Sequence, residues 1–229
     1  MRRQLVKKLS WDSKHFGFPI ARLEGRKLSA SKMIAARRAC LKNKIKCLYL
    51  TVGSDDPESI RQAEKNGFEL IGVRQSFELS EPRKLAKGIG KMDEKVDPSE
   101  LKKMSWLLYR DSRFYRDGRF PPKRVDEMFG LWAAKLKTFV FRERREIIGF
   151  VGWSSSGKKV RIELFGVHPL HQGKGIGKKL LARFLSNMRH KGYSHFETVT
   201  QGSNIPAIRV YEYAGFRINE TQLDYHKWF

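Results

Sequence analysis

An apolar run that ends in a glycine-rich turn and continues as an amphipathic helix constrains this chain more than any other feature. The run Val160–Val167 leads to Gly173, Gly175 and Gly177, and the spacing then predicts a helix over residues 177–189. Glycines let a backbone turn tightly, and the N–H groups that begin a helix face outward, where they bind anions. The segment therefore predicts a pyrophosphate-binding loop between a strand and a helix.

Polar and basic side chains surround these glycines and strengthen that interpretation. Gln172, Lys174 and Lys178 can add hydrogen-bond donors or positive charge. The loop lacks the Gly-Lys-Ser/Thr ending of a P-loop, and its glycine spacing does not fit the dinucleotide-binding fingerprint. The alternative, a tight turn without a ligand, explains the glycines and their polar neighbours less well.

Composition indicates a folded protein with an unusual charge. The chain has 229 residues, 40% of them hydrophobic, and 47 Lys and Arg against 24 Asp and Glu give a net charge of +23. Such a charge favours polyanionic partners or serves solubility, and the sequence leaves both open. Cys40 and Cys47 suit no zinc spacing, so no metal is expected and a cytoplasmic location is predicted. No apolar run approaches the roughly 18–20 residues needed to span a bilayer.

The chain is predicted to be an α/β protein with a mixed sheet in two parts. Residues 1–79 form a smaller non-catalytic half, residues 80–97 a linker, and residues 98–229 the main domain. The element predictions are helices at 30–40, 57–66, 98–108, 122–136, 177–189 and 205–214, and strands at 47–52, 138–142, 147–153, 160–167, 194–200 and 221–228. A weak repeat at an offset of 148 aligns Gly67-Phe68 with Gly215-Phe216 and indicates two halves of similar plan.

Two motifs in the main domain resemble those of the GCN5-related N-acetyltransferases (GNAT family). The first is Gln172-x-x-Gly175-x-Gly177, and the second is Asn204-x-x-Ala207-x-x-x-Tyr211-x-x-x-Gly215-Phe216. The resemblance implies a mixed sheet whose central strands splay apart, with acetyl-CoA as the co-substrate in the gap. The residues that the resemblance assigns to acetyl-CoA are Val167, Gln172, Gly173, Lys174, Gly175, Ile176, Gly177, Lys178, Asn204, Ala207 and Tyr211.

Further segments resemble the dTDP-fucosamine acetyltransferases, which acetylate the amine of a nucleotide-linked 4-amino-4,6-dideoxy sugar. They include Trp11–Gly17, Asn66-Gly-Phe68, Ser112-Arg-Phe114 and Val199-Thr-Gln201. In the predicted loop 111–120, guanidinium groups can pair with a diphosphate and aromatic rings can stack on a base. The predicted substrate-binding residues are Arg113, Phe114, Arg119 and Phe120, and a plain surface loop is the equal alternative.

Acetyl transfer to an amine needs an acid for the departing thiolate, a base for the amine and donors for the oxyanion. Tyr211 stands where the family has its general acid, and the resemblance implies an oxyanion donor on the backbone near Val167. Glu163 is the candidate base if strand alternation turns it to the same side as Val167, although a salt-bridged carboxylate is as good an interpretation. His168 and His171 are weaker candidates, and a chain of waters is a further alternative.

These observations predict an N-acetyltransferase acting as a monomer or homodimer on a nucleotide-linked amino sugar. One alternative is a protein acetyltransferase of the same fold. The other is a nucleic-acid-binding protein without activity, which the charge favours and the intact motifs oppose.

Overall fold

The computed structural model describes residues 4–25, 27–80 and 96–229. These residues form two compact units, each built from separate segments of the chain. Unit 1 contains Met1–Arg74, Ser112–Arg124 and Glu220–Phe229, and unit 2 contains Gln75–Asp111 and Val125–Asn219. Most of the predicted linker, residues 81–95, lies outside the described residues.

Unit 1 is a small sheet with helices packed against it. Its elements are β1 (Val6–Lys8), α1 (Ser10–Phe16), β2 (Ile20–Leu23), α2 (Ala30–Lys42), β3 (Cys47–Gly53), α3 (Pro57–Lys65), α5 (Arg113–Asp117), and parts of β4 (Glu69–Leu79) and β9 (Arg217–Trp228). β1 pairs antiparallel with β2, β2 parallel with β3, and β3 antiparallel with β9.

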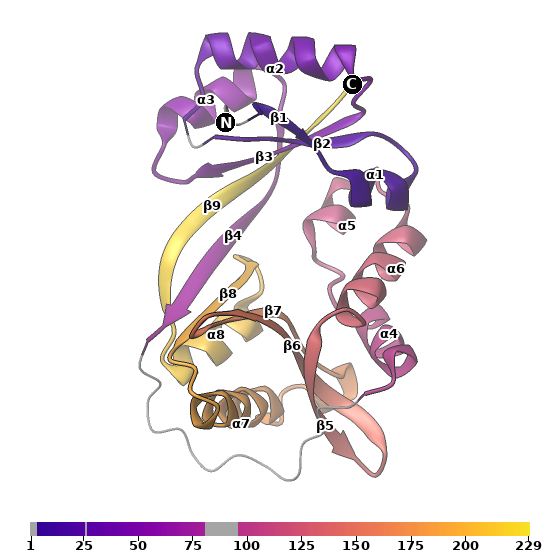
Figure 1. Ribbon diagram of the computed structural model, residues 1–229, viewed down its shortest axis with the longest axis vertical. Helices are drawn as coiled ribbons and strands as arrows, with labels where there is room; N and C mark the ends of the chain where they lie inside the picture. The colour runs from indigo at the N-terminus through magenta and orange to yellow at the C-terminus, as the bar shows by residue number, and fades with distance from the viewer. Residues whose placement is uncertain (1–3, 26, 81–95) are drawn as a thin grey trace. The chain divides into compact units, whose positions relative to one another are not determined.

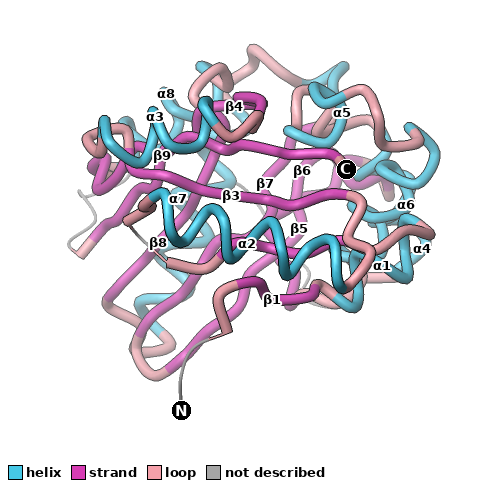
Figure 2. The backbone as a smooth tube through the Cα atoms, turned by 90° about the horizontal axis from the view of Figure 1, so that it is seen from above, coloured by secondary structure: helices cyan, strands magenta, loops and turns pink. Residues whose placement is uncertain are grey.

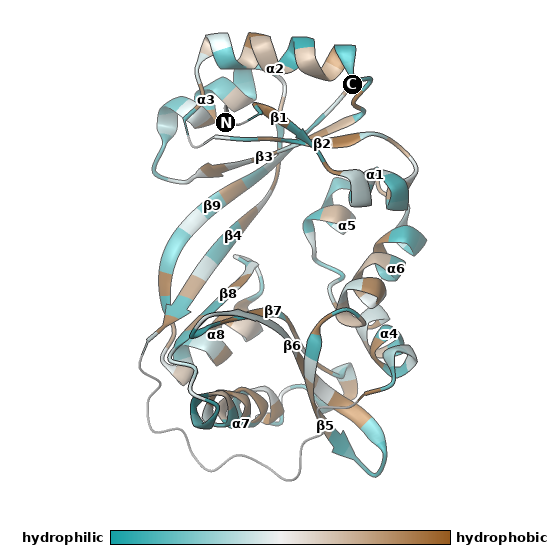
Figure 3. Ribbon diagram, viewed as in Figure 1, coloured by the Kyte–Doolittle hydropathy of each residue, from teal (hydrophilic) through white to brown (hydrophobic). Residues whose placement is uncertain are grey.

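Buried strands and one face of a helix make the core of unit 1. β3 is apolar along most of its length, as its sequence predicts, and Leu48, Leu50 and Val52 are each 1% exposed. α2 buries Met33, Ala36 and Cys40 and lies over this sheet in Figure 2. Most other positions of α2 are exposed, and hydrophilic and hydrophobic stretches alternate along the helix in Figure 3.

Unit 2 is built around a meander that runs into a parallel strand pair. Its elements are α4 (Pro98–Trp106), most of α6 (Pro122–Ala133), β5 (Lys137–Glu143), β6 (Glu146–Ser156), β7 (Lys159–Val167), η1 (Pro169–His171), α7 (Ile176–His190), β8 (His195–Gln201) and α8 (Ile205–Ala214). β5, β6 and β7 are antiparallel neighbours, while β7 and β8 run parallel. Figure 1 shows α7 and α8 beside these strands.

The amphipathic helix α7 closes the core of unit 2. Its apolar face places Phe184, Leu185 and Met188 in one buried cluster with Val151 and Phe196 from the strands. Burying these side chains stabilises the unit by roughly 2 kcal/mol each. The helices and strands predicted in this region are present, with bounds that differ by up to three residues.

The two repeats exchange their last strands. The first repeat is β3–α3–β4 and the second is β8–α8–β9, as the sequence offset indicates. In unit 1, β3 pairs with β9; in unit 2, β8 has β4 as its neighbour. Each compact unit therefore takes a strand from the other repeat, which is why the units are discontinuous in sequence.

One local prediction needs correction. The segment 111–120 was expected to be a loop, but Arg113–Asp117 forms the short helix α5. Ser112 precedes it in an extended conformation, and Gly118 ends it in the left-handed region at φ 72°. Because only glycine enters this region readily, Gly118 sets the end of the helix.

Candidate active site

The parallel strands β7 and β8 of unit 2 are paired only along the first half of β7. Their pairing runs from Lys159↔His195 to Ile162↔Thr198, and no pairing of the two strands follows. β7 itself continues to Val167. The carboxyl half of β7 thus has an edge without a β8 partner, as the predicted splay requires.

Backbone groups along this half of β7 point into the gap. The His168 N–H donates to the Ile148 carbonyl at 2.9 Å. Hydrogen-bonded and non-hydrogen-bonded pairs alternate along an antiparallel ladder, so the neighbouring pair Gly149↔Val167 is non-hydrogen-bonded. The N–H and C=O groups of Val167 therefore point away from β6. Phe165, two residues earlier, points the same way. These two N–H groups lie on the open edge of β7, which supports the predicted oxyanion donor near Val167.

The glycine loop follows η1 and leads directly into α7. Gly173 and Gly175 have φ values of 75° and 74°, and a Cβ at either would meet no atom within 4 Å. Gly175 is the N-cap of α7, and no side chain caps the helix. The first-turn N–H groups of this 15-residue helix therefore remain available to an anion.

The polar side chains of the loop hold its shape. The Gln172 amide donates to the Val167 carbonyl at 2.9 Å, and the Lys174 ammonium donates to the Leu170 carbonyl at 3.1 Å. Lys178 places its ammonium 4.4 Å from the centre of the Tyr213 ring. The donors and open space around the glycines fit a pyrophosphate, although direct contacts from these residues stay a prediction.

Tyr211 reaches the same place from α8. Its ring is 3% exposed and contacts the Phe165 ring at a centroid distance of 5.9 Å. Burial raises the pKa of Tyr211 to about 12, and a hydrogen bond with Thr198 lowers it in part. The phenol is therefore protonated at neutral pH, as a general acid must be.

Two further motif residues, Asn204 and Ala207, lie at the start of α8. Asn204 is its N-cap, and its side-chain oxygen accepts from the Ala207 N–H at 3.2 Å. Ile176, at the start of α7, and Ala207 are the remaining predicted cofactor residues in this region. The motif thus builds the start of the helix that carries Tyr211, and a contact with the cofactor remains untested.

The expected orientation of Glu163 is wrong. The register changes from Gly152↔Leu164 to Trp153↔Ile162, so Glu163 is an extra residue in a β-bulge of β7. A bulge interrupts the alternation of side chains and increases the local twist.

The bulge places Glu163 and Val167 on opposite faces of β7. The Glu163 carboxylate accepts from Ser154 Oγ at 2.8 Å and pairs with Arg161 at 3.4 Å. Ser154 follows Trp153, whose ring packs on Phe184 of α7, so Ser154 faces away from α7. The Val167 side chain instead lies 3.7 Å from where a Gly177 Cβ would stand, at the start of α7. A role for Glu163 as base remains a prediction, now from the face opposite α7.

Unit 1 holds the four residues predicted to bind the acceptor. Phe114 and Phe120 are 8% and 2% exposed and pack with Phe16, Tyr49 and His226. Their rings thus take part in the packing of the unit, while a substrate contact stays untested. Phe16, from the Trp11–Gly17 segment, belongs to the same cluster.

The two arginines of this group differ. Arg119 forms two hydrogen bonds with Glu69 at 2.8 and 2.9 Å and one with Asp117 at 2.6 Å, so it has a structural role. Arg113 lies 3.6 Å from the buried carboxylate of Asp224 and 4.9 Å from the Tyr49 ring centre. Its side chain is 24% exposed. Arg113 is therefore the better placed of the two to meet a ligand.

Other sites carry less chemistry. His168 caps η1, and His171 lies 3.6 Å from Glu143.

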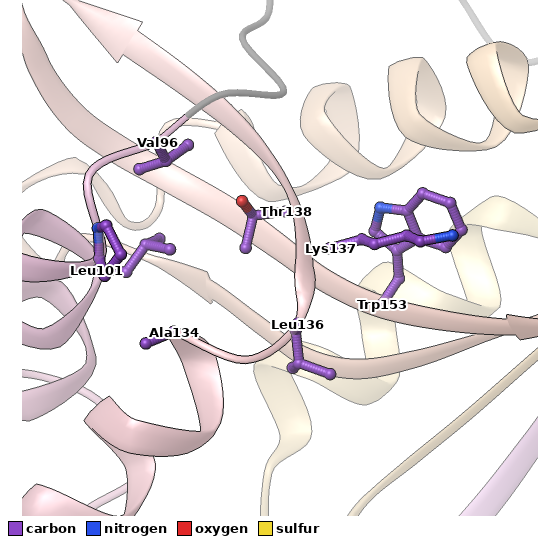
Figure 4. A pocket seen from close by; sticks show the side chains of 8 residues that line it. Val96, Leu101, Ala134, Leu136, Lys137, Thr138 and Trp153 are labelled. Atoms are coloured by element: carbon purple, nitrogen blue, oxygen red, sulfur yellow. The ribbon is translucent and has the colours of Figure 1, made fainter.

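Within the described ranges no cluster of His, Cys, Asp and Glu could hold a metal, and no helix there is long and apolar enough to cross a membrane. A cavity of about 360 Å³ lies between the start of α4 and β5–β6, and Figure 4 shows the side chains that line it. Its lining includes Leu101, Leu136 and Trp153 but no predicted site residue.

The splayed strands, anion-binding loop and buried tyrosine define an acyltransferase of mixed α/β fold. Residues 103–216 match the acetyltransferase (GNAT) family. The chain therefore carries a GNAT acetyltransferase domain, which confirms the predicted fold and enzyme class. Acetyl-CoA is the acetyl donor of this family, and the open glycine loop fits its pyrophosphate.

Similar proteins share the fold at low identity. A GCN5-related N-acetyltransferase from Sphaerobacter thermophilus matches with a TM-score of 0.69, 14% identity, and coverage of 97% of this chain and 76% of its own. A tandem GNAT protein from the clavulanic acid biosynthesis pathway matches with a TM-score of 0.61 and 17% identity, over 91% of this chain and 75% of its own. These two likenesses concern the fold alone.

One relative found by sequence is the spore coat polysaccharide biosynthesis protein SpsD of Bacillus subtilis. It is 26% identical over 126 residues, which cover 52% of this chain and 44% of that protein. The chain thus spans less than half of the length of this relative.

Sequence reasoning missed two contributors to the site. Thr198 carries no motif signal, and its role emerges only from the last β7–β8 pair and its contact with Tyr211. The bulge at Glu163 was also missed, because an apolar strand pattern does not reveal one extra residue.

Proposed function

We propose that the protein transfers the acetyl group of acetyl-CoA to the amine of a small anionic acceptor, a nucleotide-linked 4-amino-4,6-dideoxy sugar. The observation that carries the reaction is the gap in unit 2. There, open-edge N–H groups of β7, an uncapped α7 and a protonated Tyr211 all occur around one break in the sheet.

Each group that borders the gap has a separate role in the reaction. The amine attacks the carbonyl of the acetyl-CoA thioester, so that a C–N bond forms and the C–S bond breaks. CoA departs as a thiolate, and the amine nitrogen releases one proton to water. The N–H groups of Phe165 and Val167 stabilise negative charge on an oxygen placed at the open edge of β7. The Tyr211 phenol holds the proton for the leaving sulfur, and the first turn of α7 attracts the pyrophosphate.

The proposed identity of the acceptor is supported by separate observations. The segments Trp11–Gly17 and Ser112-Arg-Phe114 resemble those of dTDP-fucosamine acetyltransferases, and the name of SpsD refers to polysaccharide biosynthesis. The net charge of +23 favours an anionic acceptor over a polyamine. Arg113 adds a guanidinium oriented by a buried carboxylate, suited to a diphosphate.

The test is thiol release from acetyl-CoA across free and nucleotide-linked amino sugars. We expect a dTDP-linked 4-amino sugar to give a much higher kcat/KM than the free sugar, because remote binding energy positions the amine. Arg113→Lys should raise the KM for the acceptor more than that for acetyl-CoA, whereas Arg116→Ala on the same helix should change neither. Equal turnover of free and linked sugars would overturn the acceptor, and acetylation of protein substrates would favour a protein acetyltransferase. Salt-sensitive nucleic-acid binding without turnover would favour the non-catalytic alternative.

A further inference from the structure

Tyr109 adopts a backbone conformation that costs energy. It follows α4 in unit 2 with φ 62°, in the left-handed region that residues other than glycine seldom enter. This conformation costs roughly 1–2 kcal/mol for a residue with a side chain. The Tyr109 ring stacks on Phe129 of α6, with centroids 4.7 Å apart, and the stack fixes its direction. Strain that packing maintains in this way is frequent at functional sites.

The same segment lies against the open half of β7. A Cβ on Gly166 would come within 2.2 Å of Leu108 Cδ1, so the absence of a side chain at Gly166 leaves room for Leu108 in its present rotamer. Gly166 points to the face opposite Val167, which is also the face of Glu163. The Leu108–Tyr109 segment therefore packs on β7 from the side opposite α7.

The Tyr109 hydroxyl is buried, but its hydrogen-bonding capacity is not satisfied by the described residues around it. The hydroxyl oxygen is fully buried and has no hydrogen-bond partner of normal geometry among the described residues. The polar group that acts on it is the backbone of Phe165. Because the Phe165 N–H points into the gap, the phenol and this N–H converge on one place. A buried hydroxyl without a partner requires an explanation, and a ligand bound in the gap supplies one.

The phenol keeps its proton at neutral pH and can donate a hydrogen bond there. Burial raises the pKa of Tyr109 well above its usual range, and the nearby Tyr211 raises it further. Two phenols thus reach the gap from opposite faces of β7, Tyr109 after α4 and Tyr211 from α8. Tyr211 has the Thr198 side chain as a partner, whereas the Tyr109 hydroxyl has no side-chain partner of normal geometry in the part of the chain that the structure describes.

We propose that Tyr109 is a further catalytic residue, whose hydroxyl donates a hydrogen bond to the acyl carbonyl oxygen together with the N–H of Phe165. The proposal rests on acetyl-CoA occupying the gap but does not depend on which amine accepts the acetyl group. No covalent bond to Tyr109 forms, and its proton stays on the phenol throughout.

The test is a comparison of wild-type protein with Tyr109→Phe. The matched control is Tyr193→Phe, which removes a tyrosine hydroxyl bonded to Ser155 at 3.4 Å, away from the gap. The readouts are the infrared carbonyl band of bound [1-13C]acetyl-CoA, the affinities for acetyl-CoA and CoA, kcat, and the melting temperature.

We expect three results for Tyr109→Phe. The carbonyl band moves back toward its position in free acetyl-CoA, and affinity falls for acetyl-CoA but not for CoA. The value of kcat falls on the order of 100-fold, as for the loss of one oxyanion donor. The melting temperature is unchanged or higher, because the hydroxyl has no partner to lose; a purely structural tyrosine would lower it. The control keeps the wild-type band and kcat.

The alternatives are separable. A wild-type carbonyl band and a kcat within about twofold in Tyr109→Phe would overturn the role of Tyr109 alone. An effect on the band without turnover of any nucleotide-linked sugar would leave Tyr109 in place and overturn the proposed acceptor. A wild-type protein that does not bind acetyl-CoA would overturn both.

Discussion

Thr198 Oγ1 donates a hydrogen bond to the Ile162 carbonyl at 3.2 Å, and these two residues form the last pair between β7 and β8. The side chain of Thr198 thereby bridges the strands at the point where they part. The same hydroxyl group interacts with Tyr211, so one buried threonine links the start of the gap to the proposed acid. Thr198 is 2% exposed, and no water can replace these contacts easily.

Thr198→Val keeps the shape of the side chain and removes its hydroxyl. The protein should lose about 1 kcal/mol of unfolding free energy, because the Ile162 carbonyl loses its donor. The value of kcat should fall, while the affinity for acetyl-CoA changes little, since Tyr211 loses its partner but the glycine loop remains. Thr138→Val, at a buried threonine of β5, is the control for stability alone. A kcat equal to that of the wild type would show that Thr198 only ties the strands together.

Gly175→Ala adds a Cβ where the structure is open and the backbone is left-handed. The added methyl group should project into the place of the anion, and affinity for acetyl-CoA should fall tenfold or more by calorimetry. Gly157→Ala provides a matched control, because Gly157 also has a positive φ, 57°, and open space in the β6–β7 turn. Both variants should lose about 1 kcal/mol of stability. Equal affinities in the two variants would contradict the assignment of the loop.

Asp117→Asn tests a buried network of unit 1. Burial disfavours the charge of Asp117, yet hydrogen bonds from His226, Arg119 and Trp228 outweigh it and lower the pKa to about 2. Between this value and the unfolded value of 3.8 the unfolded chain binds more protons, so stability falls as the pH falls through this window. The ionised carboxylate thus contributes about 2 kcal/mol above pH 4.

Chemical denaturation from about pH 5 to about pH 2 measures the effect. The stability difference between the wild type and Asp117→Asn should be greatest at pH 5 and shrink toward pH 2. Parallel stability curves would mean that the carboxylate charge does not contribute.

Local patterns predicted the elements that build the gap. The alternation of apolar residues located β7, and the glycines located the turn before α7, because both depend on neighbours in sequence. The position of Tyr211 followed from the motif that also fixes the Asn204 cap. These features need no knowledge of distant contacts, so a single sequence contains them.

Long-range pairing explains what the sequence did not reveal. The exchange of β4 and β9 joins residues far apart in the chain, such as Tyr49 and His226, and no local pattern encodes such a choice of partner. The bulge at Glu163 shifted a predicted base to the other face, since one unpaired residue reverses the alternation. Tyr109 carries no motif, and only its strained φ and buried hydroxyl distinguish it.

Tyr211→Phe removes the proposed acid and keeps the ring that packs against Phe165. The value of kcat should fall strongly while the affinity for acetyl-CoA stays unchanged, because the hydroxyl acts only as charge develops on the leaving sulfur. The pKa of Tyr211, raised to about 12 by burial, adds a second expectation. The wild-type kcat should not decline from about pH 8 to about pH 10, where an ordinary tyrosine would already be half ionised. Pre-steady-state measurement of thiol release separates this step from product release. A full kcat in Tyr211→Phe would assign the proton to another group, and a decline centred near pH 10 would mean that the acid is not buried.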